Sequence, residues 1–133
     1  MSDKLSQGAT VFIVDDDQAV RDSLRVAFET LDLRCREFSS AQEFLDADAA
    51  PARGCLIVDM RLPGMNGLEL LQTLRSRGIT IAVILITGHG DEEMNAQAKR
   101  LGALALLQKP FPFGELARSV REALQSQEGG DTP

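Results

Sequence analysis

Three consecutive carboxylates, Asp15, Asp16 and Asp17, directly follow the apolar run at residues 11–14. Like charges at the end of a buried strand repel one another and lose hydration, so they should draw positive charge to the same place. A hard cation that prefers oxygen ligands is the obvious candidate. The acidic triplet therefore predicts a cation site after the first strand.

Polar side chains also follow three later apolar runs: Asp59, Thr87 and Lys109. In an open sheet of parallel strands, ligands bind outside the carboxyl ends of the strands, so these residues should meet the acidic triplet at one rim. Each residue alone has a structural explanation, because an Asp after a strand commonly caps a helix, as Asp17 could, and a Lys near acids could be a simple ion pair. The four strand ends together favour a functional site.

The elements that must position these residues are read from hydrophobic periodicity. Apolar runs of strand length alternate with segments of helical period, which predicts an α/β fold of five βα units with a doubly wound parallel sheet. The expected strands are 10–14, 33–38, 55–58, 81–86 and 103–107. The expected helices are 18–31, one opening at Ser40 and ending before Pro51, one opening at Asn66 and ending at Gly78, 91–101 and 113–124.

Some details of packing follow from the same patterns. Val20 and Phe28 fall on the apolar stripe of the first helix, and we expect Cys35 and Cys55 to be buried, reduced core residues. The helix at 91–101 has a thin apolar stripe around Met94, which predicts loose attachment. A capping box is expected where Ser40 precedes Glu43, and Asn66 with Glu69 marks the start of a later helix.

Composition restricts the class of protein. The chain has 133 residues, with 14 basic against 20 acidic residues and a net charge of −6. We expect one domain at 1–126, with a polar tail or the start of a linker at 127–133. The acidic charge and the lack of a basic run argue against nucleic-acid or membrane binding by this domain, and no leader or membrane-length apolar stretch is visible, so we expect a cytoplasmic location.

Four motifs resemble those of the receiver domain of two-component response regulators, the CheY-like family. They are Val14-Asp15-Asp16-Asp17, the tract at 57–67 (IVDMRLPGMNG), Ile86-Thr87-Gly88 and Lys109-Pro110-Phe111. The tracts at 86–91 and 108–111 look most like the FixJ-type branch. The resemblance covers about residues 10–124 and implies a flavodoxin/CheY-like strand order 2-1-3-4-5.

The resemblance implies a phosphoacceptor role for Asp59, which would take a phosphoryl group from a sensor histidine kinase or a phosphotransfer protein. The implied cofactor is Mg²⁺, held by Asp16, Asp59, the Arg61 backbone carbonyl and water, with Asp15 acting through water. Lys109 would pair with Asp59 and then with the phosphoryl group, aimed by a cis bond to Pro110. Thr87 would sense the phosphorylation of Asp59. The chain would not be an enzyme that acts on other molecules.

The resemblance also implies an output. The fourth helix, fifth strand and fifth helix, around Met94, Leu106 and Val120, would form the readout face and a possible homodimer surface. Leu106 stands where many relatives have Tyr or Phe, so an aromatic switch there is excluded. Arg61 and His89 are expected to tune the lifetime of the phosphoryl group, and transcription control would need an output domain that is not in this sequence.

The same residues allow other interpretations. A receiver-like interaction module without phosphorylation is the main alternative, although its usual sign, loss of a site residue, is missing. A dehalogenase-type phosphatase needs a second acid where Arg61 stands, and a calcium-binding EF-hand needs Gly and Glu where Val20 and Val26 stand. A nucleotide-binding turn would be Gly-rich rather than triply acidic.

Overall fold

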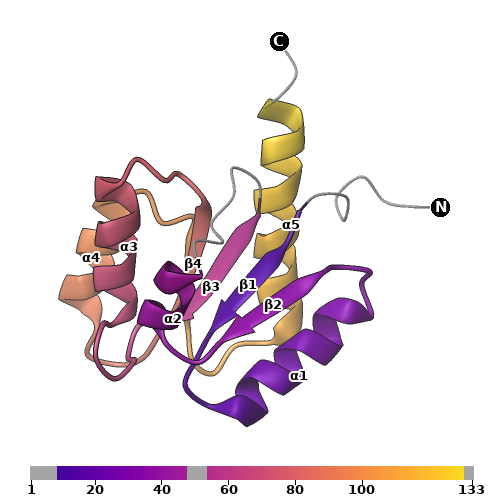
Figure 1. The fold of residues 1–133 in the computed structure, drawn as a ribbon, viewed down its shortest axis with the longest axis horizontal. Helices are drawn as coiled ribbons and strands as arrows, with labels where there is room; N and C mark the ends of the chain where they lie inside the picture. Colours follow the sequence, from indigo (N-terminus) through magenta and orange to yellow (C-terminus); the bar gives the residue numbers. More distant parts are fainter. Residues whose placement is uncertain (1–8, 48–53, 131–133) are drawn as a thin grey trace.

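The computed structural model describes residues 9–47 and 54–130, and in these residues strands and helices alternate along the chain (Figure 1). The strands are β1 (Val11–Val14), β2 (Cys35–Phe38), β3 (Cys55–Asp59), β4 (Ala82–Thr87) and β5 (Ala105–Gln108). The helices are α1 (Gln18–Glu29), α2 (Ala41–Asp46), α3 (Gly67–Ser76), α4 (Glu92–Arg100) and α5 (Phe113–Gly130). The predicted βα alternation is confirmed.

The strands form one parallel sheet in the order β2-β1-β3-β4-β5, as expected. Strand β1 pairs with β2 on one side and with β3 on the other, so that Val14 is in register with both Phe38 and Val58. The order in which successive strands are added to the sheet therefore reverses between β1 and β3. Ligands bind at such a reversal in open sheets, where Asp15 directly follows β1 and Asp59 ends β3.

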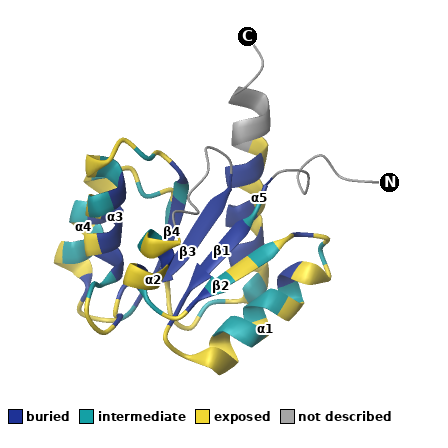
Figure 2. Ribbon diagram, in the orientation of Figure 1, coloured by how far each residue is buried: buried dark blue, intermediate teal, exposed yellow. Residues whose placement is uncertain are grey.

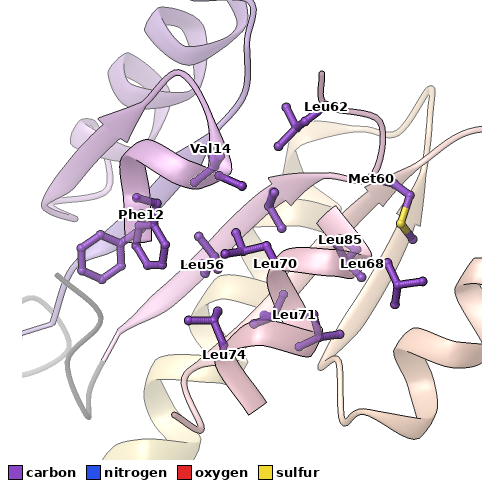
Figure 3. Packing of buried hydrophobic residues seen from close by; sticks show 14 of the residues in the cluster. Phe12, Val14, Leu56, Met60, Leu62, Leu68, Leu70, Leu71, Leu74 and Leu85 are labelled. Atoms are coloured by element: carbon purple, nitrogen blue, oxygen red, sulfur yellow. The ribbon is translucent and has the colours of Figure 1, made fainter. Parts of the chain in front are cut away.

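The core lies on both faces of the sheet because successive strand residues point to opposite sides. On one face, Phe12, Leu56 and Val58 pack beneath α2, α3 and α4 against Phe44, Leu70, Leu71, Leu74 and Ala98 (Figure 3). On the other face, Ile13 and Ile57 pack beneath α1 and α5 against Phe28, Leu116, Val120 and Leu124. Each fully buried side chain of this size contributes about 1.5–3 kcal/mol, so the two faces hold the strand ends in place.

Helix starts are fixed by side-chain caps. Asp17 accepts from the Ala19 N–H at 2.9 Å, as the structural explanation of that residue supposed. The Asn66–Glu69 capping box forms in both directions. Only half of the predicted Ser40–Glu43 box forms. Ser40 accepts from the Glu43 N–H, but the Glu43 carboxylate accepts from the N–H of Ser39 instead of that of Ser40.

Several predicted boundaries shift, including the start of β2, which lies at Cys35 rather than at residue 33. Helix α5 is expected to end at residue 124 but continues to Gly130, because the residues after Leu124 have no apolar periodicity from which a helix could be predicted. The expected domain boundary at 126/127 thus falls within a helix. Helix α1 ends at Glu29 and β5 begins at Ala105, each two residues inside the prediction. Helix α2 ends at Asp46, and its predicted limit at Pro51 lies outside the described residues.

Burial departs from prediction at two residues. Val20 is exposed, because it lines an open cavity between the start of α1 and the sheet. Cys55 is fully buried, which raises the pKa of its thiol to about 12, but Cys35 on the edge strand is only half-buried. Figure 2 shows this contrast between the covered central strands and β2.

Helix α4 buries few of its side chains, as its thin apolar stripe predicts. Ala98 is its only buried residue, and Met94 packs half-buried against the same core face. Within the described residues, no helix combines the length and hydropathy needed to cross a membrane.

Candidate functional site

The carboxyl ends of β1, β3, β4 and β5 meet around one cavity of about 300 Å³. Its lining brings together the residues predicted from the four strand ends, with neighbours from the loops: Asp15, Asp16, Asp17, Val20, Asp59, Arg61, Thr87, Gly88 and Lys109. Parallel strands deliver these groups to one rim although they are far apart in sequence.

Asp59 is the last residue of β3 and is buried, with 8% of its surface exposed. Its Oδ2 lies 2.9 Å from the Lys109 Nζ, and its Oδ1 accepts the Arg61 backbone N–H at 2.8 Å. The hydrogen bond to Asp59 raises the pKa of Lys109. One carboxylate oxygen thus contacts the Lys109 ammonium, while the other accepts a hydrogen bond from the backbone.

Asp15 is the second buried acid of the cavity. Burial raises its pKa, the Asp17 N–H bound to its Oδ1 at 2.8 Å opposes that shift, and the nearby charge of Asp59 adds to it. The Arg21 guanidinium holds the Asp15 carbonyl oxygen at 2.6 Å. The negative charge of Asp59 therefore lies close enough to Asp15 to raise the pKa of Asp15, and a cation at this place would offset that repulsion.

The donor set fits a cation that keeps part of its water. In the described part of the chain, no three His, Cys, Asp or Glu side chains converge as a ready-made metal cage. Asp15 and Asp59 line the cavity from two strand ends, and Asp16 lines it from an exposed position. One or two carboxylates with water and a carbonyl suit Mg²⁺, which rarely uses an all-protein cage.

Thr87, at the end of β4, is 3% exposed, and its carbonyl accepts the Lys109 N–H at 2.9 Å. The Lys109–Pro110 peptide bond is cis, as predicted. Two predicted tuning residues lie outside the cavity: exposed His89, whose Nδ1 is 3.0 Å from the Gln108 Nε2, and half-buried Leu106, which pairs with Leu85 across the sheet.

Asp91 is the residue that sequence reasoning missed, since it was read only as a helix start. Its side chain is 0% exposed, and its Oδ1 pairs with the Arg61 Nη2 at 2.5 Å. Its Oδ2 accepts the Gly88 N–H at 2.9 Å. Burial tends to raise the pKa of Asp91, but the bonds from Gly88 and Arg61 hold it below its usual value. The signal in the sequence was a pair of opposite charges, Arg61 and Asp91, in the loops that follow two adjacent strands.

The comparisons with known proteins agree with this geometry. Residues 11–121 match the model of the response regulator receiver domain. This chain belongs to the response regulator receiver domain family. The match covers all five strands of the receiver domain and the first half of α5.

Relatives of this receiver domain include transcriptional regulators. It is 42% identical over 120 residues to the transcriptional regulatory protein FixJ of Azorhizobium caulinodans, covering 90% of this chain and 57% of that protein. It is 41% identical over 121 residues to TdiR of Thauera aromatica, covering 91% and 53%. The chain thus spans little more than half the length of these relatives.

Solved structures are similar as well. The crystal structure of FixJ-N has a TM-score of 0.79 and 37% identity, covering 90% of this chain and 95% of that chain. Full-length FixJ from B. japonicum has a TM-score of 0.81 and 34% identity, covering 90% and 59%. The predicted FixJ-like receiver fold is confirmed.

The Arg61–Asp91 pair ties the loop after Asp59 to the loop after Thr87. Asp91→Ala would leave the Gly88 N–H without its acceptor, so we expect a loss of about 1–2 kcal/mol in the free energy of unfolding and faster amide exchange at Gly88. Hydrogen exchange read by NMR measures this, with Glu92→Ala as an exposed acidic control. Equal exchange at Gly88 in both variants would show that the tie does not hold the loop.

Proposed function

We propose that this receiver domain is a phosphoacceptor switch, in which Asp59 takes a phosphoryl group from a phosphohistidine of a sensor histidine kinase or phosphotransfer protein. The observation that carries the proposal is the contact of 2.9 Å between the Lys109 Nζ and the Asp59 Oδ2 at a buried acid beside Asp15. An ammonium that is paired with a nucleophilic carboxylate can pair with an oxygen of the transferred phosphoryl group once that group carries the negative charge.

In this reaction, a carboxylate oxygen of Asp59 forms a bond to phosphorus as the bond from phosphorus to the histidine nitrogen breaks. The released imidazole keeps the electron pair of that bond and takes up a proton. The Arg61 N–H fixes the Asp59 Oδ1, which orients the carboxylate toward the cavity. Lys109 then pairs with a phosphoryl oxygen, so the ammonium is never left without an anion.

Asp15, Asp16, Asp59 and the Arg61 backbone carbonyl are the residues that would hold Mg²⁺. When bound, Mg²⁺ supplies positive charge that offsets the repulsion between the carboxylate and the incoming phosphoryl oxygens. The Asp15 side chain would contribute a carboxylate oxygen. The backbone carbonyl of the same residue is held in place by the Arg21 guanidinium. Asp17 is engaged as the α1 cap and acts only through its charge.

The response passes through Thr87, whose hydroxyl would donate to a phosphoryl oxygen and draw the loop before α4 inward. A modification shifts an equilibrium only by its different interaction with the two states, and the new bonds from Thr87 and Lys109 supply that difference. The thin packing of α4 makes it the element that moves, with α4, β5 and α5 as the output face and a possible homodimer surface. Arg61 and His89 would tune the lifetime of the phosphoryl group.

The larger protein is a further part of the proposal. Since FixJ and TdiR are transcriptional regulatory proteins about twice as long as the matched region, we assign this domain to transcription control through an output domain. Signal transfer of this kind places it in the cytoplasm. The domain itself would act on its own acceptor only, without binding nucleic acid or membrane and without turning over a separate substrate.

The test is phosphorylation by acetyl phosphate, read by intact-protein mass spectrometry. We expect one phosphoryl adduct that requires Mg²⁺ and is lost with EDTA or in Asp59→Asn. Asp22→Asn, which changes a half-exposed acid of α1 that does not line the acceptor cavity, should keep the adduct. If neither acetyl phosphate nor any histidine kinase yields an adduct, the chain is a receiver-like interaction module and the proposal is wrong.

A further inference from the structure

Arg21, near the start of α1, joins the acidic loop to the edge strand β2. Its Nη1 donates to the Asp15 backbone carbonyl at 2.6 Å, and its Nε forms an ion pair with the Glu37 Oε1 at 3.5 Å. Glu37 can reach α1 because it is in register with Ile13, which packs on the side of the sheet that α1 covers. Arg21 does not line the acceptor cavity, so its effect on the site must pass through Asp15.

The carbonyl that Arg21 holds belongs to the peptide bond between Asp15 and Asp16, the two acids assigned to Mg²⁺ on this loop. A peptide unit is planar, so a fixed carbonyl oxygen also fixes the direction in which the chain enters Asp16. On the other side of Asp15, its N–H donates to the Phe38 carbonyl at 3.1 Å. Asp16 is exposed, so the backbone does most to place its carboxylate. The contact with Arg21 therefore orients both acids.

Charge alone would not favour an arginine at this place, because a guanidinium beside a cation site repels Mg²⁺. The Glu37 carboxylate offsets that charge. Its second oxygen, Oε2, accepts from the Arg25 Nε at 2.7 Å, so the carboxylate is held between two arginines. Glu37 thus keeps the Arg21 guanidinium aimed at the Asp15 carbonyl while it lowers the repulsion that Mg²⁺ would meet.

We infer that Arg21 is a positioning residue for the Mg²⁺ site, that Glu37 orients it, and that it raises the affinity for Mg²⁺ although it is itself a cation. It acts by fixing the peptide unit between Asp15 and Asp16. Groups that hold metal ligands in place commonly raise metal affinity about 10–100-fold. This inference rests on the proposed function, to which it adds a determinant of metal affinity outside the acceptor cavity.

The first test uses the sign of the effect to separate positioning from charge. Arg21→Met should bind Mg²⁺ about tenfold more weakly than the unaltered chain, read from amide NMR shifts during a titration with MgCl₂. If the guanidinium acted only by its charge, its loss would strengthen Mg²⁺ binding instead. Arg36→Met removes a guanidinium of β2 that lies over the Phe38 ring, and it should not weaken binding. Unchanged or stronger Mg²⁺ binding by Arg21→Met would overturn the inference and leave phosphorylation of Asp59 intact.

The second test is a milder variant, Glu37→Gln, which keeps the shape of the side chain. It should weaken Mg²⁺ binding about threefold in the unaltered chain and not at all in Arg21→Met, because it acts through Arg21. Glu29→Gln, which removes an exposed acid paired with Arg25, should leave the affinity unchanged. Equal losses from Glu37→Gln in both backgrounds, or from Glu29→Gln, would contradict the inference. Failure of the unaltered chain to bind Mg²⁺ would instead overturn the proposed metal site itself.

Discussion

Lys109→Ala should accept a phosphoryl group more slowly than the unaltered chain and fail to pass the event to the loop before α4. Asp59 and the other acidic groups remain, so the acceptor is still present. The variant lacks the ammonium that lies 2.9 Å from the Asp59 Oδ2 and that would pair with a phosphoryl oxygen after the transfer. Loss of one such donor at a site of developing charge lowers the rate by about 10²–10³-fold.

The loop response is measured at the Gly88 amide, which borders Thr87 and is bound by Asp91. Once the phosphoryl group is on Asp59, the unaltered chain should show a changed NMR shift there. Fully modified Lys109→Ala should not. Lys99→Ala, which removes an exposed lysine of α4 away from the acceptor, is the matched control. A normal Gly88 response in modified Lys109→Ala would refute the assigned role of the ammonium.

Gly67→Ala should damage both stability and the site. A Cβ at this first residue of α3 would come to 2.7 Å from the Asp59 carbonyl oxygen, 2.8 Å from the Leu85 Cδ2 and 3.0 Å from the Met60 Cα. Two of these atoms belong to the backbone beside the acceptor, so the loop must move to admit the methyl group. Overpacking of this kind costs about 2–3 kcal/mol in the free energy of unfolding.

Denaturant unfolding measures the loss of stability, and acetyl phosphate labelling measures the displacement of Asp59. Gly114→Ala in α5 is the matched control, because its added Cβ meets nothing within 4 Å and alanine favours a helix. We expect the control to match or exceed the unaltered chain in stability and to label normally. Equal stability of the two variants would show that α3 can shift without disturbing β3.

The sequence predicts the fold well because its signals are local and agree with one another. The apolar runs at Val11–Val14 and Cys55–Asp59 are too short for helices and stop at acids, and the parallel sheet then places Asp15 beside Asp59. The end of α5 was missed for a related reason, since a polar helix that projects past the core has no apolar stripe to read.

The residue types of the site and the contact between Lys109 and Asp59 were predicted, but the partner of the Arg61 side chain was not. Arg61 was singled out for its position two residues after Asp59, yet its guanidinium pairs with Asp91, thirty positions further along the chain. Such a pair depends on the spacing of β3 and β4, which one sequence does not encode locally.

Borohydride trapping of the phosphorylated chain tests the central claim most directly. Reduction converts an aspartyl phosphate to homoserine, and peptide mass spectrometry then identifies which of the clustered acids carried the phosphoryl group. The account predicts homoserine at position 59 alone, formed only when Mg²⁺ was present during phosphorylation. Homoserine at Asp15, Asp16 or Asp17, with position 59 unmodified, would contradict it.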